Sequence, residues 1–322
     1  MARLSELEFF AIYLGEVENF FAGIPQTIDP HPAPAQYAEA LATLRAKCEA
    51  NFETTQRNEF TVRDDGISYR VSMLVSISET IYVLRRFPPK VPDIHTLGIH
   101  PRHVEKLMTP GITGLIVVAG AFGQGKTTTA SSLLTARLAK YGGVGITVED
   151  PPEMPLEGHH GHGICYQTWV EQGGFGNEIR KAARWSPSII FLGEVRDGES
   201  AAEALRASIN GRLVICTTHA GSVTMAIERL YSLANAAAGN SEDVANLLAN
   251  GLTAVLHQRL ESDVAGVKRP KLQFLWIGEN DNSREYNSKG VRNTIRQRRF
   301  DQIENDVMLQ LNQMIMMKGK SA

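Results

Sequence analysis

The chain has few cysteines and no long hydrophobic run. Its 322 residues include three cysteines, Cys48, Cys165 and Cys216, which stand far apart without CxxC spacing. This spacing excludes a disulfide framework and a zinc knuckle, and small buried thiols in a reducing compartment explain the three cysteines best. The most apolar run, residues 115–119, is much shorter than the roughly 20 residues of a membrane-spanning helix. The sequence therefore predicts no membrane-spanning segment.

Charge of one sign is also lacking. Thirty-three Lys and Arg residues face 35 Asp and Glu residues, which gives a formal net charge of −2. Bulk electrostatic binding of nucleic acid or anionic lipid is thus not expected, because it requires many phosphates to be neutralised at once. Glu6 and Glu8 stand where a signal peptide needs an uninterrupted apolar core. We expect a cytoplasmic protein that reaches a membrane only through partners.

The composition and length favour two folded domains. Hydrophobic residues make up 43% of the chain and charged residues 21%, as in ordinary globular proteins. At roughly 150 residues per domain, 322 residues suggest two domains. We predict an N-terminal domain at 1–86, a linker at 87–98 and a second domain at 99–322.

Residues 1–86 predict a small α+β domain. Asp65-Gly66 is a strong hairpin-turn signal between two alternating segments. Arg85 and Arg86 follow the last predicted strand, and the prolines of residues 87–92 then predict a stiff, extended connection. The predicted elements are a helix opened by the capping box Ser5-x-x-Glu8, a helix at 37–51, and strands at 59–64, 67–75 and 81–84.

Residues 99–322 show the pattern of an α/β domain. Short apolar strands alternate with helices, which predicts a mainly parallel sheet covered on both faces. The region from about residue 241 adds further helices. The predicted strands lie at 115–119, 145–149, 189–192, 213–217 and 272–277, and the helices between them at 126–140, 177–185, 199–209 and 224–237.

A phosphate-binding loop follows the first of these strands. The segment GAFGQGKT fits GxxxxGK[ST] and is preceded by a strand and followed by a helix. Its glycines let backbone N–H groups surround a phosphate chain at the positive end of the helix. Lys126 supplies a charge to the phosphates, and the Thr127 hydroxyl is a ligand for Mg²⁺. The predicted nucleotide-binding residues are Gly120, Gly123, Gln124, Gly125, Lys126, Thr127 and Thr128.

Three polar residues follow the ends of other predicted strands. Glu194 ends a buried strand that we expect beside the phosphate loop, and a glutamate there suits the polarisation of water better than metal ligation. Glu149 and His219 end strands at the same carboxyl edge, where open α/β sheets bind ligands. For His219, a γ-phosphate sensor and a structural hydrogen-bonded residue stay equally open. The cluster His159-His160-x-His162 lacks matched carboxylates, so we do not expect a metal site there.

Four segments in order resemble those of a known superfamily. GAFGQGKTT, ITVEDPPE, SPSIIFLGEVRDGESAAEAL and GRLVICTTHAGS are similar to the Walker A, Asp-box, Walker B and His-box segments of the secretion and pilus-motor ATPases. This is the PilT- and GspE-like superfamily, with the Dot-type conjugation and type IVB secretion ATPases. The resemblance covers roughly residues 60–300. It implies a RecA-like P-loop NTPase domain preceded by a small PAS-like α+β domain, and hexameric rings.

The resemblance also implies roles for single residues. Glu149 and Glu194 are then acidic catalytic residues, His219 holds the His-box position, and Arg70 and Arg85 are presented to the phosphates of ATP. Residues 257–260 and 291–295 resemble C-terminal helical signatures of the family. Phe122 and Gln124 replace the small residues common in this loop. The lack of a zinc-binding cysteine cluster favours the retraction-like or Dot-type branch.

The function implied is a hexameric ATPase that uses ATP and Mg²⁺ to power a type IV secretion, conjugation or pilus machine. Its partners would be further copies of itself and inner-membrane platform proteins, which would hold it at the cytoplasmic face of the inner membrane without direct binding of nucleic acid. A nucleic-acid motor and an adaptor without hydrolysis are the alternatives. The one basic cluster is explained most simply as a solvated helix face or subunit contact: Arg284, Lys289, Arg292, Arg296, Arg298 and Arg299.

Arg85 is expected to link hydrolysis to movement. It precedes the stiff connection at residues 87–92, so it reaches a γ-phosphate only if the N-terminal domain closes over an ATPase sheet, its own or a neighbour's. Arg86, beside it, is expected to be the solvated one of the pair.

Overall fold

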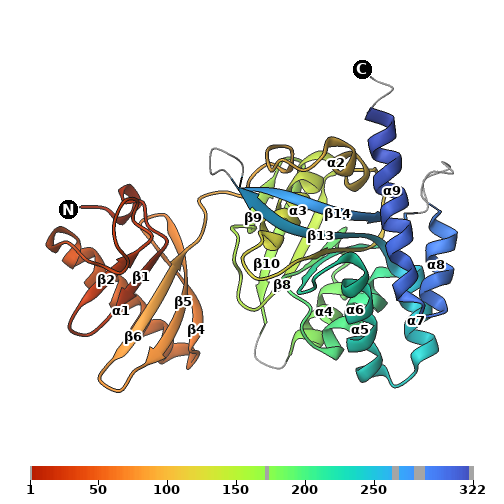
Figure 1. Cartoon of the computed structure of the whole chain (residues 1–322). Coiled ribbons are helices and arrows are strands. Elements are labelled where there is room, and N and C mark those ends of the chain that lie inside the picture. Colours follow the sequence, from red (N-terminus) through yellow and green to blue (C-terminus); the bar gives the residue numbers. More distant parts are fainter. Residues whose placement is uncertain (1, 171–173, 263–267, 279–286, 319–322) are drawn as a thin grey trace. The chain divides into compact units, whose positions relative to one another are not determined.

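The computed structural model describes residues 2–170, 174–262, 268–278 and 287–318 (Figure 1). The chain forms two compact units. The first comprises Met1–Lys90 together with Pro151–Pro155, and the second comprises Val91–Asp150 and Leu156–Ala322. The predicted classes, α+β and then α/β, are confirmed.

The first unit contains a six-stranded antiparallel sheet in the order β3-β2-β1-β6-β5-β4 and the helix α1 (Ala38–Thr55). The predicted hairpin is confirmed with its bounds, and both turn residues have positive φ, 46° at Asp65 and 75° at Gly66, as a tight hairpin turn requires. The strands are β1 (Ala11–Leu14), β2 (Asn19–Ala22), β3 (His31–Pro32), β4 (Glu59–Asp64), β5 (Ile67–Val75) and β6 (Thr80–Arg86).

The predicted opening helix is wrong. Leu4–Glu6 form a single 3₁₀ turn, and the chain then enters β1, which pairs with both β2 and β6. The Ser5 hydroxyl donates to an Asp65 carboxylate oxygen at 2.6 Å instead of capping a helix. Ile12 is fully buried opposite Leu84 of β6, so strand pairing and burial in the sheet outweigh the local capping signal.

The second unit is built on an eight-stranded sheet in the order β14-β13-β7-β12-β11-β8-β10-β9. Its six central strands are parallel, and β14 and β9 pair antiparallel at the two edges. The five strands that the sequence predicts are all present. The bounds are β7 (Gly114–Ala119), β8 (Gly143–Glu149), β9 (Gly158–His160), β10 (Gly163–Trp169), β11 (Ile189–Leu192), β12 (Leu213–Thr218), β13 (Leu252–Ser262) and β14 (Lys268–Trp276).

Two expectations about this sheet are wrong. Residues 257–260 form part of β13, not a helix, because all four pair with β14 and His257 also pairs with Ala119 of β7. The strand that leads to Glu194, β11, is not the neighbour of β7, because β12 lies between them. The neighbours of β7 are instead β12, which His219 follows, and β13. Residues 291–295 lie in α8, so the helix predicted there is confirmed.

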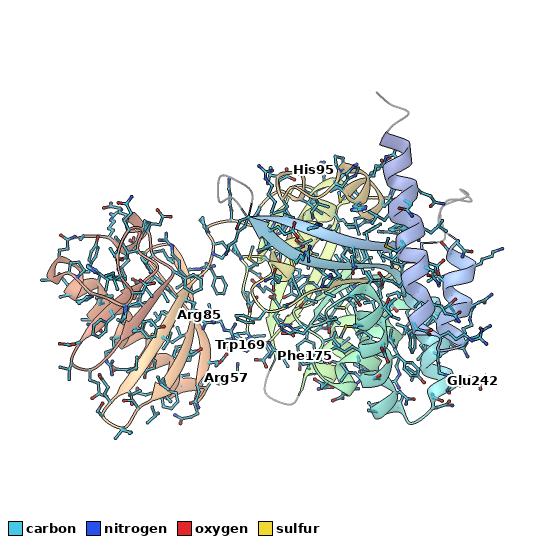
Figure 2. All side chains as sticks on the ribbon, in the orientation of Figure 1. Arg57, Arg85, His95, Trp169, Phe175 and Glu242 are labelled. Atoms are coloured by element: carbon cyan, nitrogen blue, oxygen red, sulfur yellow. The ribbon has the colours of Figure 1, made fainter. Side chains whose placement is uncertain are left out.

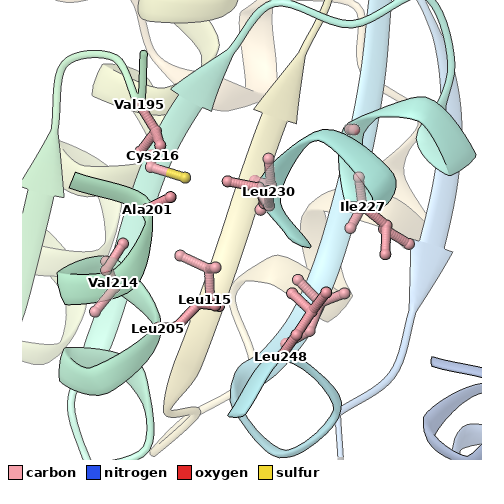
Figure 3. Close-up of a cluster of buried hydrophobic side chains, with 14 of the residues drawn as sticks. Leu115, Val195, Ala201, Leu205, Val214, Cys216, Ile227, Leu230 and Leu248 are labelled. Atoms are coloured by element: carbon pink, nitrogen blue, oxygen red, sulfur yellow. The ribbon is translucent and has the colours of Figure 1, made fainter. Parts of the chain in front are cut away.

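Helices cover both faces of the sheet. Leu115 and Ile146 face a core shared with α4 to α9, whereas Gly145, next along β8, faces Leu134 and Leu138 of α3. Figure 3 shows the first of these cores between the sheet and its helices. The helices are α2 (Pro101–Leu107), α3 (Lys126–Tyr141), α4 (Phe175–Arg184), α5 (Gly198–Ser208), α6 (Val223–Ala238), α7 (Ser241–Gly251), α8 (Ser288–Arg296) and α9 (Ile303–Lys318).

Within the described ranges, no helix combines the length and apolar character needed to cross a bilayer.

One residue of the predicted basic cluster is not solvated. Arg292 is buried and donates to the carbonyls of Asn250 (3.0 Å) and Ile277 (3.2 Å), so the expectation that it lies on a solvated helix face is wrong. Its role is to satisfy backbone acceptors near the end of α7. Arg284 lies outside the described residues.

Candidate active site

The phosphate loop joins β7 to α3 at the carboxyl edge of the sheet. Gly125 caps α3 with φ +74°, and Gly123 has φ +72°, conformations that glycine adopts without strain. Lys126 is the first residue of α3 and is only 8% exposed. Its ammonium group donates to the carbonyl of Ala121 at 2.9 Å, across the loop. The loop thus has a fixed shape around the positive end of a helix of 16 residues.

His219 connects the loop lysine to Glu194. Its Nε2 lies 2.9 Å from a carboxylate oxygen of Glu194, and its Nδ1 lies 3.4 Å from the Lys126 ammonium. An ammonium group only donates, so Nδ1 accepts and Nε2 carries the hydrogen that Glu194 accepts. The other carboxylate oxygen of Glu194 accepts from Nε of Arg196 at 2.8 Å. The side chains that follow β11 and β12 therefore meet at the loop even though these strands are not both its neighbours.

Glu149 is the buried acid of the site. It ends β8, is 1% exposed, and accepts a hydrogen bond of 2.8 Å from the Gln167 amide of β10. A Cβ at Gly193 would lie 3.2 Å from Glu149 Cγ, so the glycine before Glu194 allows the two acids' strands to approach closely. Gln167 was not found from the sequence, because β10 carries no motif and its pairing with β8 is a property of the sheet.

Thr127 and Thr128 lie in the first turn of α3 and are half-buried. A hydroxyl at this position and nearby carboxylates are hard oxygen donors, which fit Mg²⁺. Among the described residues, no group of three or more His, Cys, Asp or Glu side chains is arranged to hold a metal ion alone. Mg²⁺ bound here would therefore take most of its ligands from phosphate oxygens and water.

Arg70 and Arg85 lie opposite each other in the N-terminal sheet. They are register partners on β5 and β6, which places both side chains on one face of that sheet. Arg70 is ion-paired with Glu59 (3.2 Å) and with Glu153 (3.1 Å), whereas Arg85 is exposed (Figure 2). Glu59 and Glu153 therefore offset the charge of Arg70, and Arg85 is the more exposed arginine of this cross-strand pair.

Arg86 is not the solvated arginine of the pair, contrary to expectation. Strand alternation turns it to the other face of β6, where its guanidinium donates to the Leu7 carbonyl at 2.7 Å. It also lies over the Phe9 ring, 5.3 Å from the centroid. Arg86 therefore supports the fold of the first unit, and Arg85 is the exposed residue.

The strand order and the loop define a P-loop NTPase of the RecA-like kind. The chain belongs to the type II/IV secretion system protein family, whose match extends over residues 47–320. The protein transport protein HofB homolog of Escherichia coli K12 is 30% identical over 252 residues, which are 71% of this chain and 50% of that protein. Type II secretion system protein E of Klebsiella pneumoniae is 32% identical over 70% of this chain and 46% of its own length. The chain thus spans about half the length of these relatives.

Solved structures are similar over most of the chain. A crystal structure of the pilus retraction motor PilT with bound ADP has a TM-score of 0.77 at 25% identity, covering 99% of this chain and 91% of that one. The ATPase DotB of Legionella pneumophila has a TM-score of 0.71 at 17% identity over 93% and 85% of the two chains, which shows a shared fold.

Proposed function

We propose that this protein is an ATPase that binds ATP with Mg²⁺ at the loop of residues 120–127 and hydrolyses it. One observation carries the proposal: His219 joins the loop lysine to the strand-end acid Glu194. A γ-phosphate at the loop would lie beside all three groups. Loss of this phosphate would therefore change the interaction of Lys126 with His219 and, through His219, that of Glu194. Family membership supports the same activity.

Each residue then has a distinct role. Lys126 neutralises the phosphate charge, and Thr127 supplies a hydroxyl to Mg²⁺. Glu194 orients the attacking water, and Glu149 is a second catalytic acid of the site. Gly120, Gly123, Gln124, Gly125 and Thr128 complete the binding loop.

We further propose a homohexameric ring in which Arg70 and Arg85 reach bound nucleotide. A head-to-tail interface that closes on itself suits a site and arginines that lie on separate units. The ring would work at the cytoplasmic face of the inner membrane, on platform proteins of a type IV secretion, conjugation or pilus machine. The likeness to PilT supports the retraction-like branch.

The test compares three single variants of the full chain. Lys126→Ala should lose measurable ATP binding, whereas Glu194→Gln should bind ATP as the wild type does and hydrolyse it at least 100-fold more slowly, on the order of a lost general base. Glu228→Gln, on the exposed side of α6, is the control and should change neither quantity. Wild-type affinity in Lys126→Ala would sink the proposal.

The same assay with single-stranded DNA addresses the nucleic-acid motor. Neither the family match nor the curated relatives support that alternative, so DNA should leave the hydrolysis rate unchanged. Hydrolysis by the wild type excludes the adaptor without activity.

A further inference from the structure

Two glutamines attach the phosphate loop to β13. Gln258 of β13 is 2% exposed, and its amide nitrogen donates to the main-chain carbonyl of Gln124 at 2.6 Å. Its amide oxygen accepts from the Thr129 hydroxyl of α3 at 2.7 Å. In return, the Gln124 side-chain oxygen accepts from the main-chain N–H of Leu260 at 2.7 Å. We call Gln124 and Gln258 the glutamine brace.

β13 approaches the phosphate loop so closely that two of the loop glycines have little or no room for a side chain. A Cβ at Gly120 would lie 2.4 Å from the Gln258 carbonyl oxygen, closer than any real contact. A Cβ at Gly125 would lie 3.0 Å from the Gln258 amide nitrogen. Both ends of the loop therefore pack directly against β13.

The brace determines the direction of one backbone donor. The peptide that joins Gln124 to Gly125 is planar and trans, so its carbonyl and its N–H point in opposite directions. Because Gln258 holds the carbonyl toward β13, the Gly125 N–H points away from β13. A phosphate loop works through N–H groups that are oriented before the ligand arrives.

We propose that the glutamine brace is a positioning device that aims the Gly125 N–H at the phosphate chain of the nucleotide. This inference rests on the proposed function, since it assumes a nucleotide at the loop. It also explains why a glutamine stands at position 124, where small residues are common: only a longer side chain reaches the backbone of β13. Gln124 and Gln258 act on the ligand through the loop backbone.

The experiment separates positioning from stability with a matched control. Gln310 of α9 is also a buried glutamine, and it bonds the Trp276 main chain through both amide atoms, at 2.8 and 2.9 Å. Gln258→Met and Gln310→Met thus remove the same chemical group from two buried places. Thermal unfolding and ATP binding are measured on both, in the full chain, and inorganic tripolyphosphate serves as a phosphate-only competitor.

Both variants should lower the unfolding temperature, but only Gln258→Met should weaken ATP binding, by about ten- to 100-fold for one lost contact to a charged group. The affinity for tripolyphosphate should fall by the same factor, because the lost contact is to phosphate. Equal ATP affinity in Gln258→Met and Gln310→Met would overturn the brace.

A second variant tests the proposal if Gln258→Met does not fold. Gln124→Met removes the bond to Leu260 from a half-buried loop position and should also weaken ATP and tripolyphosphate binding together; wild-type affinity here would overturn the proposal. Failure of the wild type itself to bind ATP would refute the proposed function. Wild-type binding that is insensitive to both substitutions would refute the brace alone.

Discussion

The arginine pair at the end of β6 allows a sharp test, because its two members face opposite sides of the sheet. Arg85→Ala removes an exposed side chain that lies opposite Arg70. Arg86→Ala removes a side chain that bonds the Leu7 carbonyl and covers the Phe9 ring. Arg86→Ala should therefore lower stability, whereas Arg85→Ala should lower turnover and leave stability almost unchanged.

The structure sets the size of each effect. A hydrogen bond from a charged donor is worth about 1.5–3 kcal/mol, and a partly exposed cation–π contact about 0.5–1 kcal/mol. Arg86→Ala should thus destabilise the first unit by about 2–4 kcal/mol, or roughly 10 °C or more in Tm for a unit of this size. Arg85→Ala removes an exposed side chain whose cross-strand neighbour, Arg70, is paired with Glu59 and Glu153, so it should change stability by less than about 1 kcal/mol.

Calorimetry of the full chain and steady-state hydrolysis give the two readouts. If Arg85 stabilises the transition state as an arginine finger, its alanine variant should keep ATP binding and lose about 10³-fold or more in rate. Mixing Arg85→Ala with Lys126→Ala subunits would restore activity if the arginine acts across subunits. A destabilised Arg85→Ala, or an Arg86→Ala as stable as the wild type, would refute the assignment of faces. Wild-type turnover in Arg85→Ala would refute its catalytic role.

Two further predictions concern histidines. Burial, with a smaller contribution from His100, lowers the pKa of His103 from 6.5 to about 4, so its stabilising contribution is complete above pH 6.5 and is lost as the pH falls toward 4. His103→Phe should remove about 2 kcal/mol of this acid sensitivity, measured by urea unfolding at pH 4.5 and 7; unchanged sensitivity would contradict it. His219→Ala should lower kcat by about 100-fold and leave ATP affinity within a few-fold, since Glu194 loses its link to Lys126. A variant with wild-type kcat would show that the link is structural.

Local signals in the sequence were sufficient to predict structures whose conformation depends on the residues of one short segment alone. The Asp65-Gly66 turn needs two residues with positive φ, and the hairpin has its predicted bounds. The phosphate loop between β7 and α3 is likewise a local arrangement of glycines and a lysine, so its place in the fold was predictable. The family followed from four such segments in order.

Local signals were misleading where tertiary pairing decides. The capping box at Ser5 was a sound helix signal, but burial of Ile12 against β6 outweighs it. β13 was missed because an apolar segment becomes a central strand only when β7 and β14 lie on either side of it. Strand alternation alone places Arg85 and Arg86 on opposite faces of β6, but which of them lies over Leu7 and Phe9 depends on how the first unit packs.

By itself, the sequence determined the class of this protein and the chemistry of its loop, because both depend on residue types at fixed spacing. The tertiary structure alone decided which groups meet. Strand order puts His219 beside the loop and between Lys126 and Glu194, and it brings Gln258 against Gln124 from more than a hundred residues away. Contacts of this kind depend on sheet topology and register, which arise only when the whole core packs.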